Sequence, residues 1–529
     1  MCGILFSSGT NQSRNAFQDA LDSMSHRGPD YQGTWFNDAG VAMGHNRLSI
    51  QDTLARSNQP FVSGDGNHVL IFNGEIYNFK ELRKDFQLNC RTESDTEVLL
   101  ELYIKLGPAM LEHLNGMFAF VIYNTQTTDV FAARDRLGIK PLYHYQAKNR
   151  LIFASEIAAV LTLAPQQEFD SLGIRQYLKL RTFFNGHTIH KNISMFPAGH
   201  YYLNGKVVEY WRLPEQPTRE HWHLDEIESL IGSAVDYRCI ADVPLGSYLS
   251  GGLDSTIITL LTKNRFTWTV GSATNNEFEW ARMAANHLGT EHDELVVSKE
   301  EYLEAAEHLI DIRREPLSVP NEVMIYKMTQ RVKRENTVVL SGEGADEAFS
   351  GYDRIYRWAN SSAWDVAQFD AHYSYGSHSD LEIVAYASEP YRSRESCLDI
   401  VSAFMQTSHL HGLLRRLDNS TMMCAVEARV PFVDHRLVEY MSGAPLSFRM
   451  KDGIIKAPLK QIYGTRLPRQ LVEREKVGFP VDLEDVLPGS NENMMDRWLD
   501  YNMSRVVGEN WSELKSNIFA DAHIEAGVS

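Results

Sequence analysis

A run of glycines, serines and one aspartate interrupts the chain at residues 249–256, which read LSGGLDST, and the apolar run IITLL follows at 257–261. Two adjacent glycines let a backbone approach an anion closely, and a helix that begins here offers unpaired N–H groups and the positive end of its dipole. Ser250 and Ser255 add hydroxyl donors. The stretch therefore predicts a phosphate-binding turn between a buried strand and a helix.

A second acidic turn that contains glycine follows a later predicted strand. Residues 341–347 read SGEGADE directly after the apolar run TVVL at 337–340. Asp254 would repel a bare phosphate, but Asp254 and Asp346 could share a divalent cation if both turns lie at the same end of one sheet. We therefore expect Mg²⁺ to accompany a phosphate-bearing substrate. For the first turn alone, the alternative is a glycine-rich connection in which Asp254 caps the helix.

The second residue of the chain is a candidate nucleophile. Cys2 directly follows Met1, and cysteine is small enough that we expect the methionine to be removed. The mature chain would then begin with a thiol beside a free α-amine. An α-amine, with a pKa of about 7.7–8.0, can act as the base for its own thiol, alone or through a water. Without further motifs, a cysteine at this position would be an accident of sequence.

The order of predicted elements divides the chain into two halves. Short apolar or alternating runs in the first two hundred residues are typical of an antiparallel sheet. The expected elements there are strands at 69–72, 117–123, 130–133 and 151–154, and helices at 13–25 and 94–106. From about residue 225, strands alternate with helices, as in a parallel sheet with crossover connections. The expected elements are strands at 245–249, 266–270, 294–297 and 337–340, and helices at 255–263, 278–288 and 299–313. A linker is predicted at residues 213–217, and the chain beyond 400 is predicted to be mainly helical.

Length and composition exclude several classes of protein. A chain of 529 residues is too long for one hydrophobic core, so two or three domains are expected. The formal net charge of −18, with no concentrated basic patch, disfavours a nucleic-acid partner. The five cysteines form no CxxC pair, which argues against disulfides and zinc and fits a reducing compartment. With no signal peptide and no membrane-length apolar run, we expect a cytoplasmic protein without a membrane partner.

Three motifs of the second half resemble known enzymes. SGGLDS is similar to the pyrophosphate-binding loop of the ATP pyrophosphatase superfamily, which cleaves ATP to AMP and pyrophosphate. SGEGADE with the following Gly351-Tyr352, and VEARVPFVDHR at 426–436, resemble the synthetase domain of asparagine synthetases. The resemblance implies that ATP is bound by Leu249, Ser250, Gly251, Gly252, Asp254, Ser255, Val270, Ser341, Gly342 and Lys456. It also implies that Asp254 and Asp346 hold Mg²⁺ and that Lys476, with Lys456, neutralises the departing pyrophosphate.

The N-terminal half closely resembles the glutaminase domain of class II glutamine amidotransferases, an N-terminal-nucleophile fold. The segments that carry this resemblance are SHRGPD at 25–30, HNRLSI at 45–50, FNGEIYN at 72–78, ESDTE at 93–97 and RDRLGIKPLY at 134–143. It implies that Cys2 attacks the carboxamide of glutamine and that Asn73 and Gly74 stabilise the oxyanion. Arg47 would bind the α-carboxylate of glutamine, and Glu75 and Asp95 its α-ammonium. His26 and Arg27 are interpreted as structural.

Together the two resemblances imply an αββα sandwich of α+β type over residues 2–212. An α/β ATP-pyrophosphatase domain with a parallel sheet and a helical C-terminal part follows over 220–529. The implied function is glutamine-dependent amidation of a carboxylate that ATP has activated as an acyl-adenylate, with aspartate as the favoured acceptor. The partners are then small molecules (glutamine, ATP and the acceptor), and a homodimer is left open. The last forty or so residues carry no functional signal.

The identity of the acceptor is the least determined part of this prediction. Leu413 lies fourteen residues before the glutamate of EARVPF, where several asparagine synthetases have an aspartate near the acceptor and other bacterial members have an apolar residue. The same chemistry on a sugar acid, a cell-wall precursor or a natural-product intermediate is the alternative. Glu343 and Glu427 are expected near the acceptor's amino group or the incoming ammonia, unless Glu427 pairs with Arg429 or Arg416.

Three further classes of protein fit the sequence less well. A cyclase similar to β-lactam synthetase is expected to lack the N-terminal cysteine, so Cys2 argues against it. An enzyme that thiolates tRNA is opposed by the acidic charge and the missing CxxC. A binding module without catalysis would have to retain two sets of active-site residues without using them.

Overall fold

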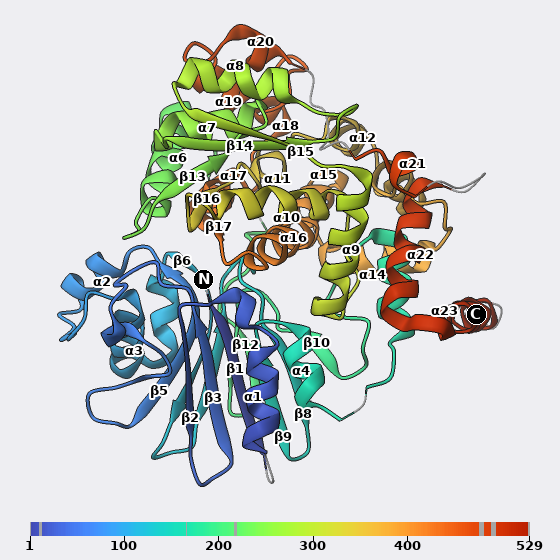
Figure 1. Cartoon of the computed structure of the whole chain (residues 1–529). Helices are drawn as coiled ribbons and strands as arrows, with labels where there is room; N and C mark the ends of the chain where they lie inside the picture. The colour runs from blue at the N-terminus through green and yellow to red at the C-terminus, as the bar shows by residue number, and fades with distance from the viewer. Residues whose placement is uncertain are drawn as a thin grey trace.

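The computed structural model describes residues 2–9, 13–165, 167–215, 219–474, 481–487 and 493–526. Two six-stranded antiparallel sheets form the N-terminal part, and a five-stranded parallel sheet lies in the C-terminal part (Figure 1). The last strand of the antiparallel sheets ends at Glu209, and the first helix that packs with the parallel sheet begins at Leu224.

The first antiparallel sheet has the strand order β10-β8-β9-β1-β3-β2. Its strands are β1 (Gly3–Gly9), β2 (Tyr31–Phe36), β3 (Val41–Arg47), β8 (Tyr143–Ala147), β9 (Arg150–Ala154) and β10 (Ile193–Met195). Side chains alternate between the two faces of a strand, and β1 is buried on both. Ile4 and Phe6 lie in the core between the two antiparallel sheets, whereas Leu5 packs under α1 (Arg14–Asp22) and α4 (Ile157–Leu163).

The second antiparallel sheet has the strand order β12-β11-β7-β6-β5-β4. Its strands are β4 (Phe61–Val62), β5 (His68–Ile76), β6 (Gly116–Asn124), β7 (Val130–Arg134), β11 (His200–Leu203) and β12 (Lys206–Glu209). Ile71 faces the first sheet, whereas Phe72 and Phe120 pack under α2 (Phe79–Asp85) and α3 (Asp95–Leu106). Two sheets between two layers of helices confirm the predicted αββα sandwich.

The parallel sheet has the strand order β15-β14-β13-β16-β17. Its strands are β13 (Leu245–Tyr248), β14 (Phe266–Gly271), β15 (Glu291–Val296), β16 (Val338–Leu340) and β17 (Glu427–Arg429). The neighbouring helices are α6 (Leu224–Arg238), α7 (Leu253–Thr262), α8 (Phe278–Leu288), α9 (Lys299–Arg313) and α10 (Asn321–Val332). The chain moves outward from β13 to β15 and then returns to place β16 on the other side of β13. Ligands bind at such a reversal, beyond the carboxyl ends of the strands.

The remaining chain is mostly helical, as predicted for the part beyond residue 400. A long helical stretch consists of α15 (Cys397–Phe404), a π-helical turn (Met405–His409) and α16 (Leu410–Met422). The other helices are α5 (Ser171–Leu180), α11 (Ala345–Phe349), α12 (Asp353–Ser361), α13 (Val366–Tyr373), α14 (Leu381–Ser388), α17 (His435–Met441), α18 (Leu446–Arg449), α19 (Ala457–Tyr463), α20 (Arg469–Glu473), α21 (Leu483–Val486), α22 (Met494–Val507) and α23 (Trp511–Ala526).

Several boundaries differ from the sequence prediction, and three of them show why. The strand expected at 69–72 continues through Asn73 and Gly74, because these residues pair with Ala119 and Phe118 of β6. The strand expected at 294–297 begins earlier, at Glu291, where polar residues of an edge strand give no apolar signal. α7 begins two residues before the expected start at 255.

Residues of both parts form one continuous hydrophobic cluster. It includes Tyr77 and Met117 from the N-terminal sandwich and Val426 and Ala428 from the strand region of the C-terminal part. In the described part of the chain, no helix has the length and apolar character needed to cross a membrane.

Candidate active sites

Cys2 lies at the start of β1, where neighbouring segments hold its backbone. Its backbone N donates to Asn73 Oδ1 at 3.0 Å, its carbonyl accepts from Arg27 Nε at 3.1 Å, and its Sγ lies 4.0 Å from Leu48 O. The residue is 8% exposed. Burial raises the pKa of the thiol, and this outweighs the hydrogen bond to Leu48 and the charge of Arg47. The thiol therefore needs a local base, which a free α-amine on Cys2 would supply.

Asn73 and Gly74 lie beside Cys2 in β5. The buried Nδ2 of Asn73 has no hydrogen-bond partner among the described residues, although its Oδ1 is engaged by Cys2 N. A buried donor without a partner is costly, so an oxygen of a bound ligand would satisfy it. At Gly74 a Cβ would lie 2.1 Å from Met117 O, so a larger residue would push β5 away from β6. The unpaired Nδ2 of Asn73 fits one predicted oxyanion donor, and the crowding at Gly74 explains why this position needs glycine. The oxyanion role of both residues stays a prediction.

The side chain of Arg47, at the end of β3, points into the loop that follows this strand. Its Nη1 donates to Leu54 O at 2.9 Å and to Asn58 Oδ1 at 2.7 Å. Its Nη2 donates to Asp52 O at 2.6 Å and to Gln51 O at 3.3 Å. The guanidinium therefore orders this loop, and a glutamine carboxylate would have to share or replace some of these contacts. The predicted binding role of Arg47 stays a prediction.

Glu75 and Asp95, the predicted partners of the glutamine ammonium, are each only 4% exposed. Asp95, the first residue of α3, accepts from Ile76 N at 2.9 Å, and burial raises its pKa to about 6. Burial and the charge of Glu427 raise the pKa of Glu75 well above its usual range. Glu75 Oε1 also lies 3.5 Å from Arg429 Nη2 of the C-terminal part. The predicted glutamine site thus borders the second domain.

Glu427 lies on this same border. Its Oε1 accepts from Arg429 Nε at 2.5 Å, so the predicted alternative of a Glu427–Arg429 pair is confirmed. Burial raises the pKa of Glu427, but Arg429 and Lys140 outweigh burial and hold it at about 2. Glu427 is opposite Val338, at the amino end of the parallel strands. The structure therefore places it on the side of the N-terminal domain.

The turn after β13 leads into a helix whose first residue has no side-chain cap before it. Gly251 has a φ of +73°, and a Cβ there would lie 2.3 Å from Trp280 C, so glycine is required. α7 begins at Leu253, and its N-cap residue Gly252 makes no side-chain cap. A helix start without a side-chain cap is a place where anions bind in proteins. Asp254 lies in the first turn of α7, so the alternative in which it caps the helix is wrong.

The two glycine-bearing turns touch. The Oγ atoms of Ser250 and Ser255 lie 3.2 Å apart, and Gly252 N donates to Ser250 Oγ at 3.3 Å. A Cβ at Gly342 in the second turn would lie 2.9 Å from Ser255 N and 3.0 Å from Asp254 C. The predicted ATP-binding residues of both turns therefore meet where the strand order reverses.

Lys456 joins the acidic residues of the two turns. Its Nζ lies 2.5 Å from Asp254 Oδ2 and 2.7 Å from Asp346 Oδ1. Burial lowers the pKa of Lys456, but the two carboxylates outweigh burial and raise it well above its usual range. Both carboxylates therefore already converge on one cation, and hard oxygen donors of this kind suit Mg²⁺. No group of three or more His, Cys, Asp or Glu forms a metal site within the described residues. Phosphate and water would supply the remaining ligands.

The other predicted synthetase residues are dispersed around these turns. Leu249 and Val270, at the carboxyl ends of β13 and β14, are buried. Glu343, in the second turn, accepts from Arg416 Nη2 of α16 at 2.9 Å. Lys476 lies outside the described residues.

A histidine near the second turn escaped sequence reasoning. His409 Nδ1 lies 2.9 Å from Tyr373 OH, and its Nε2 lies 3.4 Å from Tyr352 OH and 3.7 Å from Glu347 Oε1. The residue ends the π-helical turn, a rare conformation that often marks functional sites. Tyr352 belongs to a recognised motif, but a histidine 57 residues later gives no spacing signal.

A cysteine at the start of β1 in an αββα sandwich, followed by two glycine-bearing turns at the reversal of a parallel sheet, is the arrangement of a glutamine-dependent amidotransferase joined to an ATP-using synthetase. Residues 1–211 match the family model described as a glutamine amidotransferase domain, and residues 226–524 match the one described as asparagine synthase. The chain belongs to the glutamine-hydrolysing asparagine synthetase family. It is a ligase that forms carbon–nitrogen bonds with glutamine as the amide donor.

The relatives cover most of the chain. Asparagine synthetase [glutamine-hydrolyzing] 1 of Bacillus subtilis is 30% identical over 90% of this chain and 84% of its own length. Amidase chry2 of Gibberella zeae is 28% identical over 82% of this chain and 79% of its own length. A solved glutamine phosphoribosylpyrophosphate amidotransferase from B. subtilis matches with a TM-score of 0.32 and 15% identity. That match covers 66% of this chain and 77% of the other.

Proposed function

We propose that the chain, in the cytoplasm, activates a carboxylate as an acyl-adenylate with ATP and amidates it with ammonia released from glutamine at Cys2. The observation that carries this proposal is the convergence of Asp254, Asp346 and Lys456 at the reversal of a parallel sheet. In a chain with a glutaminase domain, a phosphate site of this kind fits the ATP-dependent activation of a carboxylate that then receives nitrogen from glutamine.

The glutamine half-reaction begins with the α-amine of Cys2 taking the proton of its own thiol. The thiolate attacks the carboxamide carbon, and the Asn73 side chain and the Gly74 N–H stabilise the oxyanion that forms. When the oxyanion collapses, the C–N bond breaks, and the proton held by the amine leaves with ammonia. Water then hydrolyses the thioester to glutamate and restores the thiol.

The synthetase half-reaction begins with the acceptor carboxylate attacking the α-phosphorus of ATP. The bond from this phosphorus to the bridging oxygen breaks, and pyrophosphate leaves. The N-terminus of α7 and the hydroxyls of Ser250 and Ser255 bind the pyrophosphate portion, and Lys456 neutralises its developing charge. Mg²⁺, held by Asp254 and Asp346, would supply further charge neutralisation on the phosphates. Ammonia then adds to the acyl carbon of the adenylate, AMP leaves, and a proton is lost to give the amide.

The acceptor is proposed to bind between the second turn and α16. His409, Leu413 and Arg416 are spaced i, i+4 and i+7, which puts them on one face of the helix. The outer two interact with the second turn, through Glu347 and Glu343. Leu413 therefore faces the same turn between them.

Aspartate remains the favoured acceptor, because the curated relatives named above include an asparagine synthetase that covers most of the chain. Two observations favour the alternative, a carboxylate without an adjacent ammonium. Glu343, which would attract the ammonium of aspartate, is already paired with Arg416, and Leu413 adds no charge to this face of the helix. A relative named as an amidase is similar over much of the chain.

A panel of acceptors tests the proposal. The purified full chain is given ATP, Mg²⁺, glutamine and one carboxylate at a time, and pyrophosphate and glutamate are measured together. We expect one acceptor class to stimulate pyrophosphate release and to yield an amide in equal amount. Aspartate should be compared with succinate, which has the same reacting carboxylate but no ammonium. If no carboxylate stimulates pyrophosphate release, the proposed activation step is wrong.

A further inference from the structure

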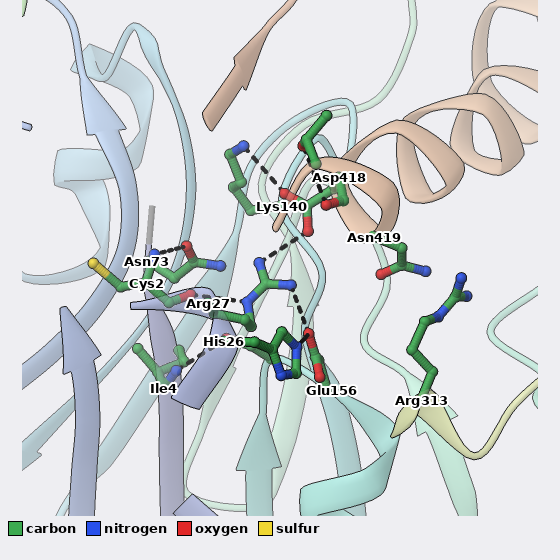
Figure 2. A network of polar contacts seen from close by, with 12 residues as sticks. Cys2, Ile4, His26, Arg27, Asn73, Lys140, Glu156, Arg313, Asp418 and Asn419 are labelled. Carbon is green, nitrogen blue, oxygen red and sulfur yellow. Dashed lines mark hydrogen bonds and ion pairs between the residues drawn. The ribbon is translucent and has the colours of Figure 1, made fainter. Parts of the chain in front are cut away.

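A continuous chain of polar contacts links Cys2 to the C-terminal domain. Arg27 Nε donates to the Cys2 carbonyl at 3.1 Å, and Arg27 Nη2 donates to Asp418 Oδ2 at 2.9 Å. Asp418 belongs to α16 of the synthetase domain, whereas Cys2 and Arg27 belong to the glutaminase domain. Figure 2 shows Arg27 between the start of β1 and the helix that carries Asp418. One guanidinium thus touches the backbone of the proposed nucleophile and a carboxylate of the other domain.

The Arg27 guanidinium is buried and hydrogen-bonded on all sides, so it has little freedom to move. Arg27 is 0% exposed and Asp418 is 3% exposed. The remaining nitrogen, Nη1, donates to Glu156 Oε1 at 3.0 Å, which also meets His26 Nε2 at 3.0 Å. Burial raises the pKa of Glu156, but His26 and Arg27 outweigh burial and lower it to about 2. All three nitrogens of the planar Arg27 guanidinium are therefore hydrogen-bonded. Because the group is rigid, the carboxylates of Glu156 and Asp418 fix the direction in which Nε points toward the Cys2 carbonyl.

Asp418 is oriented by a second cation of the glutaminase domain. Lys140 Nζ lies 3.4 Å from Asp418 Oδ1, and Lys140 is as deeply buried as Arg27. Breaking one partner of a buried ion pair is strongly unfavourable. The carboxylate therefore cannot turn away from Arg27 without leaving two buried cations less well paired.

α16 contacts both active sites from opposite sides. Arg416 pairs with Glu343 of the synthetase turn, and Asp418 pairs with Arg27. Residues two apart on a helix lie about 200° apart around its axis. The helix therefore lies between the two sites, with one face toward each.

We propose that Asp418 is a positioning residue for glutamine hydrolysis, supplied by the synthetase domain and acting through Arg27 on the Cys2 backbone. The glutaminase site is then incomplete without α16. Because the other face of α16 carries Arg416, a movement of this helix at the acceptor site would be transmitted to Cys2 through Asp418 and Arg27. The inference rests on the proposed role of Cys2.

The test is the full-length Asp418→Asn variant, which keeps the shape of the side chain and removes its charge. Two activities are measured in the same preparation, glutamate release from glutamine and pyrophosphate release with ammonium as nitrogen donor. We expect the kcat for glutamine hydrolysis to fall at least tenfold with little change in KM, because the nucleophile is misaligned and the glutamine contacts remain. Ammonium-supported synthesis should stay within twofold of the wild type.

Two further variants separate positioning from a general structural effect. Glu315→Gln changes another buried carboxylate of the C-terminal domain that contacts the glutaminase domain, through Tyr143 OH at 3.2 Å. It should leave glutamine hydrolysis within twofold. Asp418→Glu keeps the charge and should recover part of the hydrolysis that Asp418→Asn loses. A second readout is the rate at which a glutamine-like electrophile labels Cys2, which should fall in parallel with kcat.

Each remaining outcome overturns either this inference or the proposed function. Asp418→Asn with normal glutamine hydrolysis would show that Arg27 needs no help from α16. Equal loss of both activities would mean that Asp418 only stabilises the domain boundary. Cys2→Ala is run beside these variants: if it still hydrolyses glutamine, the proposed nucleophile is wrong, whatever Asp418→Asn does.

Discussion

Surroundings decide what each carboxylate of the two sites can do. Asp254 and Asp346 meet the ammonium of Lys456, so their site is already shaped around a cation. Asp95 and Glu75 are buried beside further carboxylates, and their pKa values rise. The first pair suits a metal–phosphate complex, and the second pair suits an ammonium that arrives with its own positive charge.

Asp346→Asn should abolish synthesis but spare glutamine hydrolysis. The change removes one of two negative charges that face the cation site and hardly changes the shape of the side chain. We expect pyrophosphate release to fall by about a hundredfold or more, as when a key electrostatic contact of a transition state is lost. Glutamate release should be unchanged. Asp353→Asn, on the exposed surface of the neighbouring α12, is the matched control. Normal pyrophosphate release by Asp346→Asn would rule out the assigned metal site.

The pH dependence of glutamine hydrolysis should report Asp95. Its carboxyl has a pKa of about 6, raised by burial, so it is ionised above this pH and loses its charge below it. The α-amine of Cys2 must also be neutral to act as base, and its pKa is about 7.7–8.0. The logarithm of kcat/KM should therefore fall with one slope below about pH 7.7 and with twice that slope below about pH 6. The pKa of Glu75 is raised as well, so Asp95→Asn should have a lower kcat/KM and should lose only the break at about pH 6. A wild-type profile without that break would contradict the assignment.

At the scale of elements, α16 contains the residue at which specificity for the acceptor can be tested. Leu413 lies between His409 and Arg416 on the face that meets the synthetase turn. Leu413→Asp places a carboxylate there, and a charge-assisted hydrogen bond to an ammonium contributes about 1.5–3 kcal/mol. If the natural acceptor lacks an ammonium, the preference for aspartate over succinate should rise at least tenfold. Leu413→Asn, neutral and of similar size, should not produce this change. A wild type that already prefers aspartate, with no gain in the variant, would favour aspartate as the natural acceptor.

The sequence predicts those elements whose pattern is local. Alternation and turn residues identify β6 and α3, and the strand–turn–helix rhythm identifies the parallel sheet. The course of β5 through Asn73 and Gly74 is not predictable in this way, because pairing with β6 overrides the turn preference of the dipeptide. The π-helical turn before α16 has no sequence signature either, so the position of His409 emerges only from the folded chain.

The same distinction between local patterns and long-range contacts applies to the residues of the two sites. Asp254 and Asp346 are expected at one site because each belongs to a motif of contiguous residues, whereas Cys2 becomes a candidate only through motifs elsewhere in its half of the chain. The Arg27–Asp418 contact joins residues 391 apart, and no local pattern predicts such a pairing. Arg27 was interpreted as structural from its turn alone, whereas the structure adds that its guanidinium bridges two domains.

At the scale of the whole molecule, the domains share a boundary of buried charges but use separate reactive groups. Arg429 of one domain meets Glu75 of the other, and Asp418 meets Arg27. Within the described residues, Arg27 and Asp418 link the Cys2 backbone to the synthetase domain. Among the described residues, the thiol's hydrogen bond is to Leu48 O of its own domain. The two reactions should therefore be separable by a change confined to the thiol.

Cys2→Ala tests this separation. The variant should lose all use of glutamine as nitrogen donor, since no other group can form the thioester. Ammonium should still support amide synthesis within about twofold of the wild-type rate, because Asp254, Asp346 and Lys456 are untouched. A chain that carries a tag before Cys2 should show the same defect, because it lacks the free α-amine that acts as base. The measurement is amide yield with glutamine and with ammonium. Loss of both in a folded variant would mean that the domains cannot work apart, and retention of both would mean that Cys2 is not the nucleophile.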